Sequence, residues 1–551
     1  MAHGVYKSFR KAWDKNIEKY TSFVDDYNNS LPLVTHRLLS EVKTSEELTD
    51  EVIESMLGFS FDNTHTLLYK KGDDYSLSVI SELKRICYKL CMCTITDIER
   101  EVYQAMEAFV HNLNTLHARA GSQLPFSSVN LGTDTSNAGR LVTKNLLLAM
   151  EAGLGHGETC IFPIVIFKVK EGVNYNPGDK NYDLFKLSFR VTGKRLFPNY
   201  IFLDSPFNLQ YYKPGHPETE VAQMGCRTRV IGNVYDPTRE ISYSRGNLSF
   251  TTINLPMLAI EANHDEKKFY ELLDKYLELV KKQLLERFEI QSHLKVKNLP
   301  FLMGQGVWLD SEKLGPEDEV GEVLKHGSLS IGFIGLAEAL IALYGHHHGE
   351  GQEYLDKGYA IIKHMREYTD KVASETHLNF SVLATPSEGL CGTALRKCRA
   401  KYGVIEGVTD KDYLTNSCHI PVYYDISIYD KIRLEAPFHE LCNAGHITYV
   451  EIDGDAASNP EAIEKIVRTM HDCKIGYGAI NHPVDRDPVC GYTGVIGDTC
   501  PNCGRKETPD KPKFERIRRV TGYLAGTLDM FNDAKKAEEK DRVKHGGINK
   551  L

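Results

Sequence analysis

The sequence predicts an α/β fold with a largely buried sheet. Residues 75–117 contain no proline and carry apolar residues at helical spacing, which predicts one long helix. Further along the chain, short apolar runs such as residues 160–167 alternate with helical segments such as residues 267–287. Such alternation is typical of α/β domains, in which helices cover a sheet.

Length and composition indicate a large globular protein. The chain has 551 residues, of which 42% are hydrophobic and 26% charged, so it can bury a large core and exceeds one ordinary domain. Its net charge of −9 argues against wholesale binding to nucleic acid or membranes, because both need a basic surface. No stretch approaches the ~20 apolar residues of a membrane-spanning helix. We therefore expect small molecules and other proteins as partners.

The cysteines indicate a reducing compartment. The first thirty residues are polar and amphipathic and contain no apolar run that resembles a signal peptide. Thirteen cysteines, an odd number without a secretory signal, favour free thiols over a disulfide framework. We expect a cytoplasmic protein.

Two polar segments have simple interpretations. A helix expected over residues 336–343 is followed by three consecutive histidines, residues 346–348. Consecutive side chains point in different directions, so we expect a solvated loop and assign these histidines no ligand role. The mixed-charge run at residues 535–542 is typical of a solvated helix face.

Three cysteines near the C-terminus predict a zinc site. Cys500 and Cys503 are separated by two residues in a glycine-containing turn, a spacing that presents both sulfurs to one tetrahedral ion, and Cys490 precedes them. The fourth ligand stays open between Asp487, His482, another thiol and water. The alternative is a metal-free turn. A bound ion would stiffen a short polar segment that has little core of its own.

Gly522 and Cys226 lie in two further short motifs. Gly522 stands in RRVTGYL, residues 518–524, where glycine alone is most simply a turn, and Gly526 is a competing glycine. Glycine is also the residue whose Cα becomes planar without steric conflict, as a backbone radical requires. Cys226 stands in QMGCRTRV, residues 223–230. A lone cysteine is usually a small buried hydrophobe, yet a thiyl radical can take hydrogen from a sugar C–H bond.

Together these motifs resemble the anaerobic (class III) ribonucleoside-triphosphate reductases, which are glycyl-radical enzymes. The resemblance extends from residues 103–106 through residues 125–136 to residues 545–546, and more loosely to Met1. It implies a ten-stranded α/β barrel made of two five-stranded halves. A finger loop inside the barrel would carry the thiyl cysteine, and a small C-terminal zinc-binding and glycyl-radical domain would follow.

The resemblance also implies a division of the chain. Its parts would be a mainly helical N-terminal part of the barrel domain at residues 1–120, the barrel core with its finger loop at residues 121–480, a zinc-binding segment at residues 481–510 and a glycyl-radical segment at residues 511–551. Family members carry an ATP-cone domain and a first barrel strand with a second active-site cysteine further upstream. The context of Cys87, Cys91 and Cys93 does not match that strand. We therefore expect an N-terminally incomplete or split member.

The implied activity is reduction of ribonucleoside triphosphates to deoxyribonucleoside triphosphates for DNA synthesis. A separate activase, using S-adenosylmethionine and an iron-sulfur cluster, would generate the radical on Gly522, and Cys226 would become the thiyl radical. Asn247 would lie near the ribose hydroxyls with formate as electron donor, although an asparagine beside a glycine is equally a turn. The resemblance further implies ATP and deoxynucleotide effectors and a homodimer.

Two alternatives stay open. One is a non-catalytic or split-chain nucleotide-binding subunit of such a reductase, and the other is a different glycyl-radical enzyme, such as a lyase. Residues 384–390, 415–422 and 443–447 also resemble segments at the active-site end of the family's barrel. We assign no catalytic role to Glu388 or His419 within them. Cys391 and Cys398, close to the first segment, are interpreted as incidental thiols.

Overall fold

The chain forms two compact units. The computed structural model describes residues 2–26, 38, 42–58, 68, 77–116, 124–520, 523–525 and 528–545. The first unit comprises Met1–Pro125, Leu131–Gly155 and Gly172–Leu187, and the second comprises Phe126–Asn130, His156–Glu171 and Ser188–Leu551. Within these described stretches, none of the helices has the length and apolar character needed to cross a membrane.

The first unit is built from helices. They are α1 (Ala2–Asp26), α3 (Asp50–Leu57), α5 (Leu77–Thr115) and α6 (Asn137–Ala152). Helix α5 confirms the helix expected over residues 75–117, and α1 packs against it. Phe9 and Trp13 of α1 are buried, and their rings stack with centroids 6.2 Å apart. The apolar faces of these helices therefore form a core of their own.

A five-stranded mixed sheet lies in the interior. Its order is β1 (Ser128–Leu131), β2 (Ile164–Val169), β3 (Asn199–Phe202), β10 (Tyr477–Asn481) and β9 (Thr448–Glu451). Neighbours β2 and β3 run parallel, β3 and β10 antiparallel, and β10 and β9 parallel. Every residue of β2, β3, β9 and β10 is buried. The strand expected over residues 160–167 begins only at Ile164, directly after Pro163, which has no N–H to donate.

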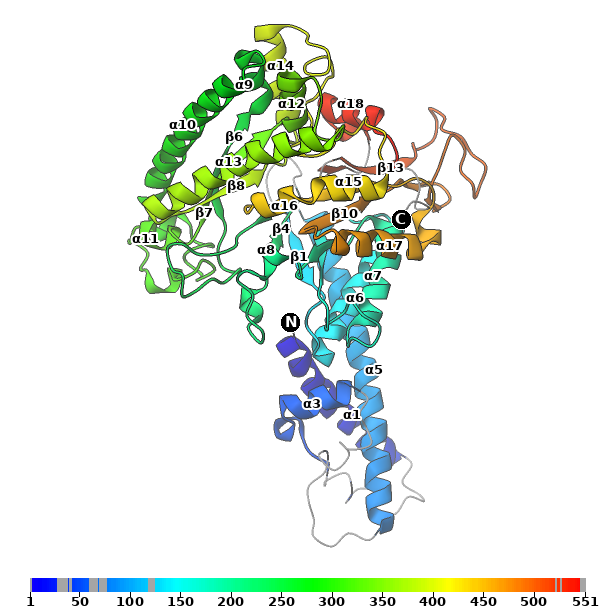
Figure 1. Ribbon diagram of the computed structural model, residues 1–551. Coiled ribbons are helices and arrows are strands. Elements are labelled where there is room, and N and C mark those ends of the chain that lie inside the picture. Colours follow the sequence, from blue (N-terminus) through cyan, green and yellow to red (C-terminus); the bar gives the residue numbers. More distant parts are fainter. Residues whose placement is uncertain are drawn as a thin grey trace. The chain divides into compact units, whose positions relative to one another are not determined.

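A second sheet consists of three parallel strands. They are β6 (Asn247–Asn254), β7 (Ser328–Ile334) and β8 (Asn379–Ala384), and β7 and β8 are buried along their whole length. Figure 1 shows helices beside these strands, namely α9 (Leu255–Ala262), α10 (Glu266–Ser292), α12 (Leu336–Tyr344) and α13 (Gln352–Thr376). Helices α10 and α12 confirm those expected over residues 267–287 and 336–343. Apolar side chains of the strands and helices share one core.

The remaining helices are short or join the sheets. They are α7 (Tyr182–Arg195), α8 (Pro206–Leu209), α11 (Gly321–Leu324), α14 (Leu390–Tyr402), α15 (Ile428–Glu435), α16 (Phe438–Leu441), α17 (Pro460–Asp472) and α18 (Asp533–Asp541). The α/β fold class is thereby confirmed. The described strands form one five-stranded and one three-stranded sheet in addition to smaller ones, so closure into ten strands stays a prediction.

A small antiparallel sheet lies toward the C-terminus. Its order is β12 (Thr493–Gly494), β11 (Val484–Arg486), β13 (Glu515–Val520) and β14 (Tyr523–Ala525). Arg519 pairs with Leu524, and Val520 with Tyr523. β13 therefore pairs with β11, the strand that follows β10, and β14 pairs with β13.

Two expectations about polar segments were wrong. The histidines at 346–348 do not form a solvated loop, because His347 and His348 are buried and the His348 ring bonds to the Cys418 carbonyl. Residues 535–542 are largely helical as expected, in α18, but Lys535 and Glu538 are buried and form an ion pair. In both places a polar side chain finds a partner inside the fold, so polarity did not indicate exposure.

A two-stranded hairpin enters the interior of the second unit. It consists of β4 (Gln223–Met224) and β5 (Thr228–Arg229), with Cys226 in the connection. The Arg229 N–H donates to the Ala444 carbonyl over 2.8 Å, and Ala444 in turn donates to Val382 of β8. Gly445 has φ of 129°, and a Cβ there would lie 1.7 Å from the Arg227 carbonyl oxygen. Only glycine permits this approach between the two backbones.

The substitution Gly445→Ala tests that contact. We expect it to lower the thermal unfolding midpoint strongly, because backbone cannot move aside as a side chain can. The matched control is Gly454→Ala: Gly454 also has positive φ, of 78°, but nothing lies within 4 Å of its added Cβ. It should cost only the left-handed strain of about 1–2 kcal/mol. Equal midpoints for the two variants would contradict the close approach.

Candidate functional site

Two buried arginines anchor the loop that carries Cys226. Arg227 is fully buried and donates from Nη1 to Asn416 Oδ1 over 2.8 Å and to Ser417 Oγ over 3.3 Å. Arg229 is also buried and donates from Nε to the Asn443 carbonyl over 3.0 Å. The hairpin that carries Cys226 is thus held by the loop between α14 and α15, which contains Asn416 and Ser417, and by the loop that precedes β9.

The loop keeps Cys226 as a neutral thiol. Burial raises the pKa of Cys226 to about 11; Glu388 reinforces the rise, whereas Arg227 and Arg519 oppose it. A nucleophilic cysteine needs the opposite shift, since the thiolate is the nucleophile. A thiol that keeps its proton at neutral pH suits transfer of a hydrogen atom.

Gly522 lies outside the described residues, as does its competitor Gly526. The strands on either side are described, and β13 carries Arg519, which is 3% exposed. Arg519 donates to Asn199, Asn199 donates to the Tyr477 hydroxyl, and that hydroxyl lies 3.5 Å from the Gly225 carbonyl oxygen, so hydrogen bonds connect β13 to the finger loop. Sequence reasoning passed over Arg519 although it stands in the RRVTGYL motif.

Asn247 begins β6 and joins a row of polar side chains. Its Nδ2 donates to Ser330 Oγ over 2.5 Å and to Ser328 Oγ over 3.2 Å, both on β7. Ser330 continues the row to Ser381 of β8, with 3.0 Å between the two hydroxyls. The amide and hydroxyls form an uncharged polar row across the three parallel strands, in which Ser328, Ser330 and Ser381 are buried.

Glu388 lies in the segment that follows β8. Burial raises the pKa of Glu388, while Lys535 and Arg227 lower it. Thr385, three residues earlier, meets Thr252 of β6 with 3.0 Å between hydroxyls. The carboxyl ends of parallel strands are a frequent place for ligands. No further role for Glu388 follows from these contacts.

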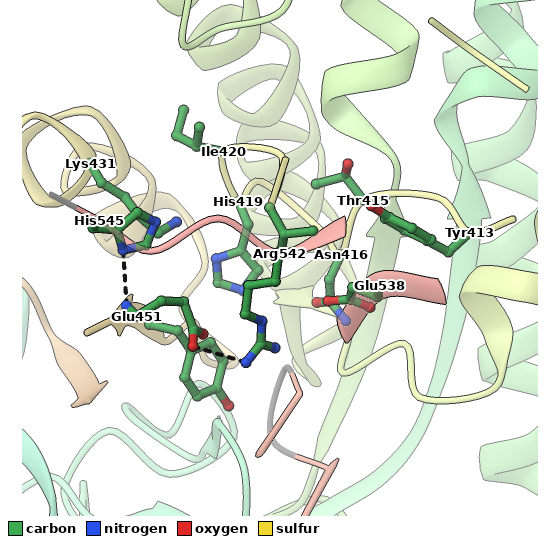
Figure 2. Close-up of a pocket in the computed structure, with 12 residues that line it drawn as sticks. Tyr413, Thr415, Asn416, His419, Ile420, Lys431, Glu451, Glu538, Arg542 and His545 are labelled. Carbon is green, nitrogen blue, oxygen red and sulfur yellow. Dashed lines mark hydrogen bonds and ion pairs between the residues drawn. The ribbon is translucent and has the colours of Figure 1, made fainter. Parts of the chain in front are cut away.

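Figure 2 shows a small cavity lined by His419 and by residues of the C-terminal segment. Its volume of about 20 Å³ suits a single water, so it cannot hold a nucleotide. Arg542 reaches into it and pairs with Glu451 over 2.9 Å, and the Glu451 N–H donates to His545 Nδ1 over 2.9 Å. The last described residues thereby pack against β9.

A cluster of buried ionisable groups lies beside this cavity. His419, Glu435 and His446 place ligand atoms within 4.8 Å of one another. The Lys431 ammonium already bonds to the Glu435 carboxylate, and burial lowers the pKa of His419 and His446. A lysine cation therefore balances the carboxylate where a metal would bind. Positions so widely spaced form no sequence motif, so sequence reasoning missed this cluster.

The three cysteines expected to bind zinc come together. The sulfurs of Cys490 and Cys500 lie 3.6 Å apart, and Cys503 Sγ lies 3.3 Å from Asp487 Oδ2. These four residues place their ligand atoms within 4.8 Å of one another, so the group can hold a metal ion. Arg505 donates from Nε to both Asp487 oxygens, over 2.7 and 2.8 Å. The arginine orients the carboxylate toward the thiols.

His482 does not belong to this cluster. Its Nε2 contacts the Thr192 carbonyl over 2.9 Å, and its Nδ1 contacts that of Pro483 over 3.2 Å. Of the open candidates for a fourth ligand, Asp487 is the side chain that the structure brings to the thiols.

Known proteins are similar to this chain over most of its length. The sequence model of the anaerobic ribonucleoside-triphosphate reductase family matches residues 25–545. The curated protein of that name from Escherichia coli (strain K12) is 36% identical over 459 residues, which are 81% of this chain and 62% of that protein. The one from Enterobacteria phage T4 is 34% identical over 462 residues, 81% of this chain and 72% of that protein.

Solved structures share the fold. An anaerobic ribonucleotide reductase superposes with a TM-score of 0.60 at 17% identity, covering 92% of this chain and 77% of the other. The Thermotoga maritima enzyme with glycerol in its active site gives 0.59 at 16% identity, covering 98% and 88%. The chain spans about 62% of the length of the Escherichia coli relative. On the family match and these identities, the chain belongs to the anaerobic ribonucleoside-triphosphate reductase family.

Proposed function

We propose that this chain carries the radical chemistry of an anaerobic reductase that converts ribonucleoside triphosphates to deoxyribonucleoside triphosphates. The observation that carries the proposal is the position of Cys226, on a loop that Arg227 anchors and that Tyr477 and Asn199 connect to Arg519 of the strand that leads to Gly522. Membership of the family supports it.

The reaction begins with hydrogen-atom transfers between the chain's own groups. A separate activase, which supplies S-adenosylmethionine chemistry and an iron-sulfur cluster, removes one hydrogen atom from the Gly522 Cα. Gly522 then takes the hydrogen atom of the Cys226 thiol, which leaves a thiyl radical on the sulfur. Cys226 takes the 3′ hydrogen of the bound ribose and returns a hydrogen atom to the same carbon at the end. Glycine suits storage of the radical because its Cα becomes planar without strain.

The remaining steps need two electrons and two protons. The 2′ hydroxyl leaves as water, and formate supplies both electrons and one of the protons and is released as carbon dioxide; the second proton comes from solution. Ribonucleotide, formate and a proton thus give deoxyribonucleotide, carbon dioxide and water. Asn247 is proposed to hold the ribose hydroxyls, because its amide sits among the hydroxyls of Ser328 and Ser330 and donates and accepts without titrating.

Nucleotides are proposed both as substrates and as effectors. Structures of the Thermotoga maritima anaerobic ribonucleotide reductase are described with dATP bound in the specificity site and with dATP and CTP. By analogy we propose ribonucleoside triphosphate substrates, ATP and deoxynucleotide effectors, an activase partner, a homodimer and a cytoplasmic location for this chain.

Zinc is the metal that we propose for the cysteine cluster. Three thiolates and one carboxylate fit its tetrahedral preference, and Cys490, Cys500, Cys503 and Asp487 are the residues that would hold it. Bound there, the ion would join the loop after β11 to the loop before β13 and so stiffen the segment that precedes Gly522.

The first prediction concerns turnover. Incubated without oxygen with activase, formate and a ribonucleoside triphosphate, the chain should form deoxynucleotide, detected by chromatography. Cys226→Ser should abolish product, because a serine O–H bond is too strong for a glycyl radical to break. Cys160→Ser is the matched control: burial also raises the pKa of Cys160 to about 11, but its thiol lies outside the finger loop, so activity should persist. Product from Cys226→Ser would refute the proposed role.

The second prediction concerns metal. Inductively coupled plasma mass spectrometry should find one zinc ion per purified chain. The Cys500→Ser variant should lose this zinc, whereas the Cys473→Ser variant, whose substitution lies outside the cluster, should retain it. Asp487→Asn should weaken zinc binding by roughly 10- to 100-fold, whether the carboxylate binds zinc or orients the thiols. Full zinc content in Cys500→Ser would exclude the proposed site.

A further inference from the structure

Arg519 is a buried cation held by neutral partners. It stands three residues before Gly522 and donates from Nε to Asn481 Oδ1 over 2.6 Å, from Nη1 to Asn199 Oδ1 over 2.7 Å and from Nη2 to the Ile480 carbonyl over 2.8 Å. The planar fork of a guanidinium makes such a set of directed bonds, which a lysine cannot reproduce.

Aromatic rings complete the environment of this side chain. The guanidinium carbon lies 5.3 Å from the ring centroid of Phe197 and 5.7 Å from that of Tyr449. Burial lowers the pKa of Arg519, so keeping the charge here costs free energy. A buried charge is weak support for stability, and fixing one geometry is the better-founded use of such a group.

The bonds of Arg519 continue to the finger loop. Asn199, which accepts from Arg519, donates from Nδ2 to the Tyr477 hydroxyl over 2.8 Å. The Tyr477 hydroxyl lies 3.5 Å from the carbonyl oxygen of Gly225, the residue before Cys226. A path of hydrogen bonds, with this one long contact, thus joins the strand before Gly522 to the loop that carries Cys226.

The C-terminal segment holds the same strand from another side. Arg542 Nη1 donates to the Arg519 carbonyl over 2.9 Å and pairs with Glu451 over 2.9 Å. Glu451 accepts from Asn481 Nδ2 over 2.6 Å, and Asn481 is itself a partner of Arg519. Both the backbone carbonyl and the side chain of Arg519 are therefore held by hydrogen bonds.

We propose that Arg519, Asn199 and Tyr477 are positioning residues that set the separation between Cys226 and the segment that carries Gly522. The catalytic meaning of this separation rests on the proposed function. Hydrogen-atom transfer requires the two groups to be nearly in contact, and a misplacement of about 1 Å can slow a reaction by about 100-fold.

A disulfide-trapping experiment measures this separation without catalysis. In the Gly522→Cys background, diamide should oxidise the introduced thiol and Cys226 to a disulfide, which mass spectrometry of the linked peptides identifies. Adding Arg519→Lys should slow this cross-link by roughly tenfold or more, because the strand loses its directed bonds. Tyr477→Phe, a milder change that removes only the hydroxyl, should slow it in the same direction.

Tyr200→Phe provides the matched control. Tyr200 is also buried, lies on β3 in register with Gly478 of β10, and bonds through its hydroxyl to Thr192 over 2.8 Å, away from the finger loop. It should leave the cross-linking rate unchanged. The proposal is overturned if the Gly522→Cys background forms no cross-link to Cys226, or if Arg519→Lys and Tyr477→Phe cross-link as fast as Tyr200→Phe.

Turnover per radical gives a second readout. With Gly522 restored, Tyr477→Phe should acquire as much radical as the unsubstituted chain, counted by electron paramagnetic resonance, yet form less deoxynucleotide per radical at an unchanged KM. A different outcome separates the two proposals. If the Gly522→Cys variant cross-links efficiently but the unsubstituted chain makes no deoxynucleotide, the proposed function is contradicted and the positioning role is retained.

Discussion

The buried guanidinium of Arg227 is the constraint on which the site depends. A finger loop inside a packed interior needs hydrogen-bond partners there, and Arg227 Nη1 donates to Asn416 and Ser417 of a distant loop. Gly445 permits the two backbones to meet at this point. The thiol of Cys226 is thereby held in surroundings of low polarity, where it keeps its proton. Burial of the loop therefore accompanies both features: the hydrogen bonds that anchor Arg227 and the raised pKa of the Cys226 thiol.

The C-terminal segment is also held in place by buried polar contacts. Short polar strands with little core of their own must be held against a sheet, and the structure uses directed bonds for this purpose. Asp485 of β11 pairs with Arg518 over 2.7 Å, Arg519 bonds to β3 and β10, and Arg505 orients Asp487 toward three thiols. Each contact fixes one geometry. Such directed contacts suit the proposed function, in which this segment would present one backbone atom to one sulfur.

The helices and the cysteine cluster could be predicted from the sequence because each leaves a local pattern of residues. Helical spacing identified α5 and α10, and the spacing of Cys500 and Cys503 identified the metal cluster. Other features depend on tertiary partners and leave no local pattern. His348 is buried because its ring finds the Cys418 carbonyl, and Asn199 and Tyr477 acquire their place only when β3 and β10 pair. The sequence left Asp487 as one of several candidates for the fourth zinc ligand. The structure removes His482 from these candidates, because its ring contacts the Thr192 carbonyl instead of the thiols.

We propose Gly522 as the site of a stored radical, and isotope labelling tests this most directly. The anaerobic chain, treated with activase, reductant and S-adenosylmethionine, should give an electron paramagnetic resonance doublet from the single remaining α-hydrogen. Chain grown on glycine deuterated at Cα should give a collapsed, singlet-like signal, and Gly522→Ala should give none. A doublet that persists in Gly522→Ala, or whose splitting is unchanged by deuteration, would contradict the assignment of the radical to Gly522.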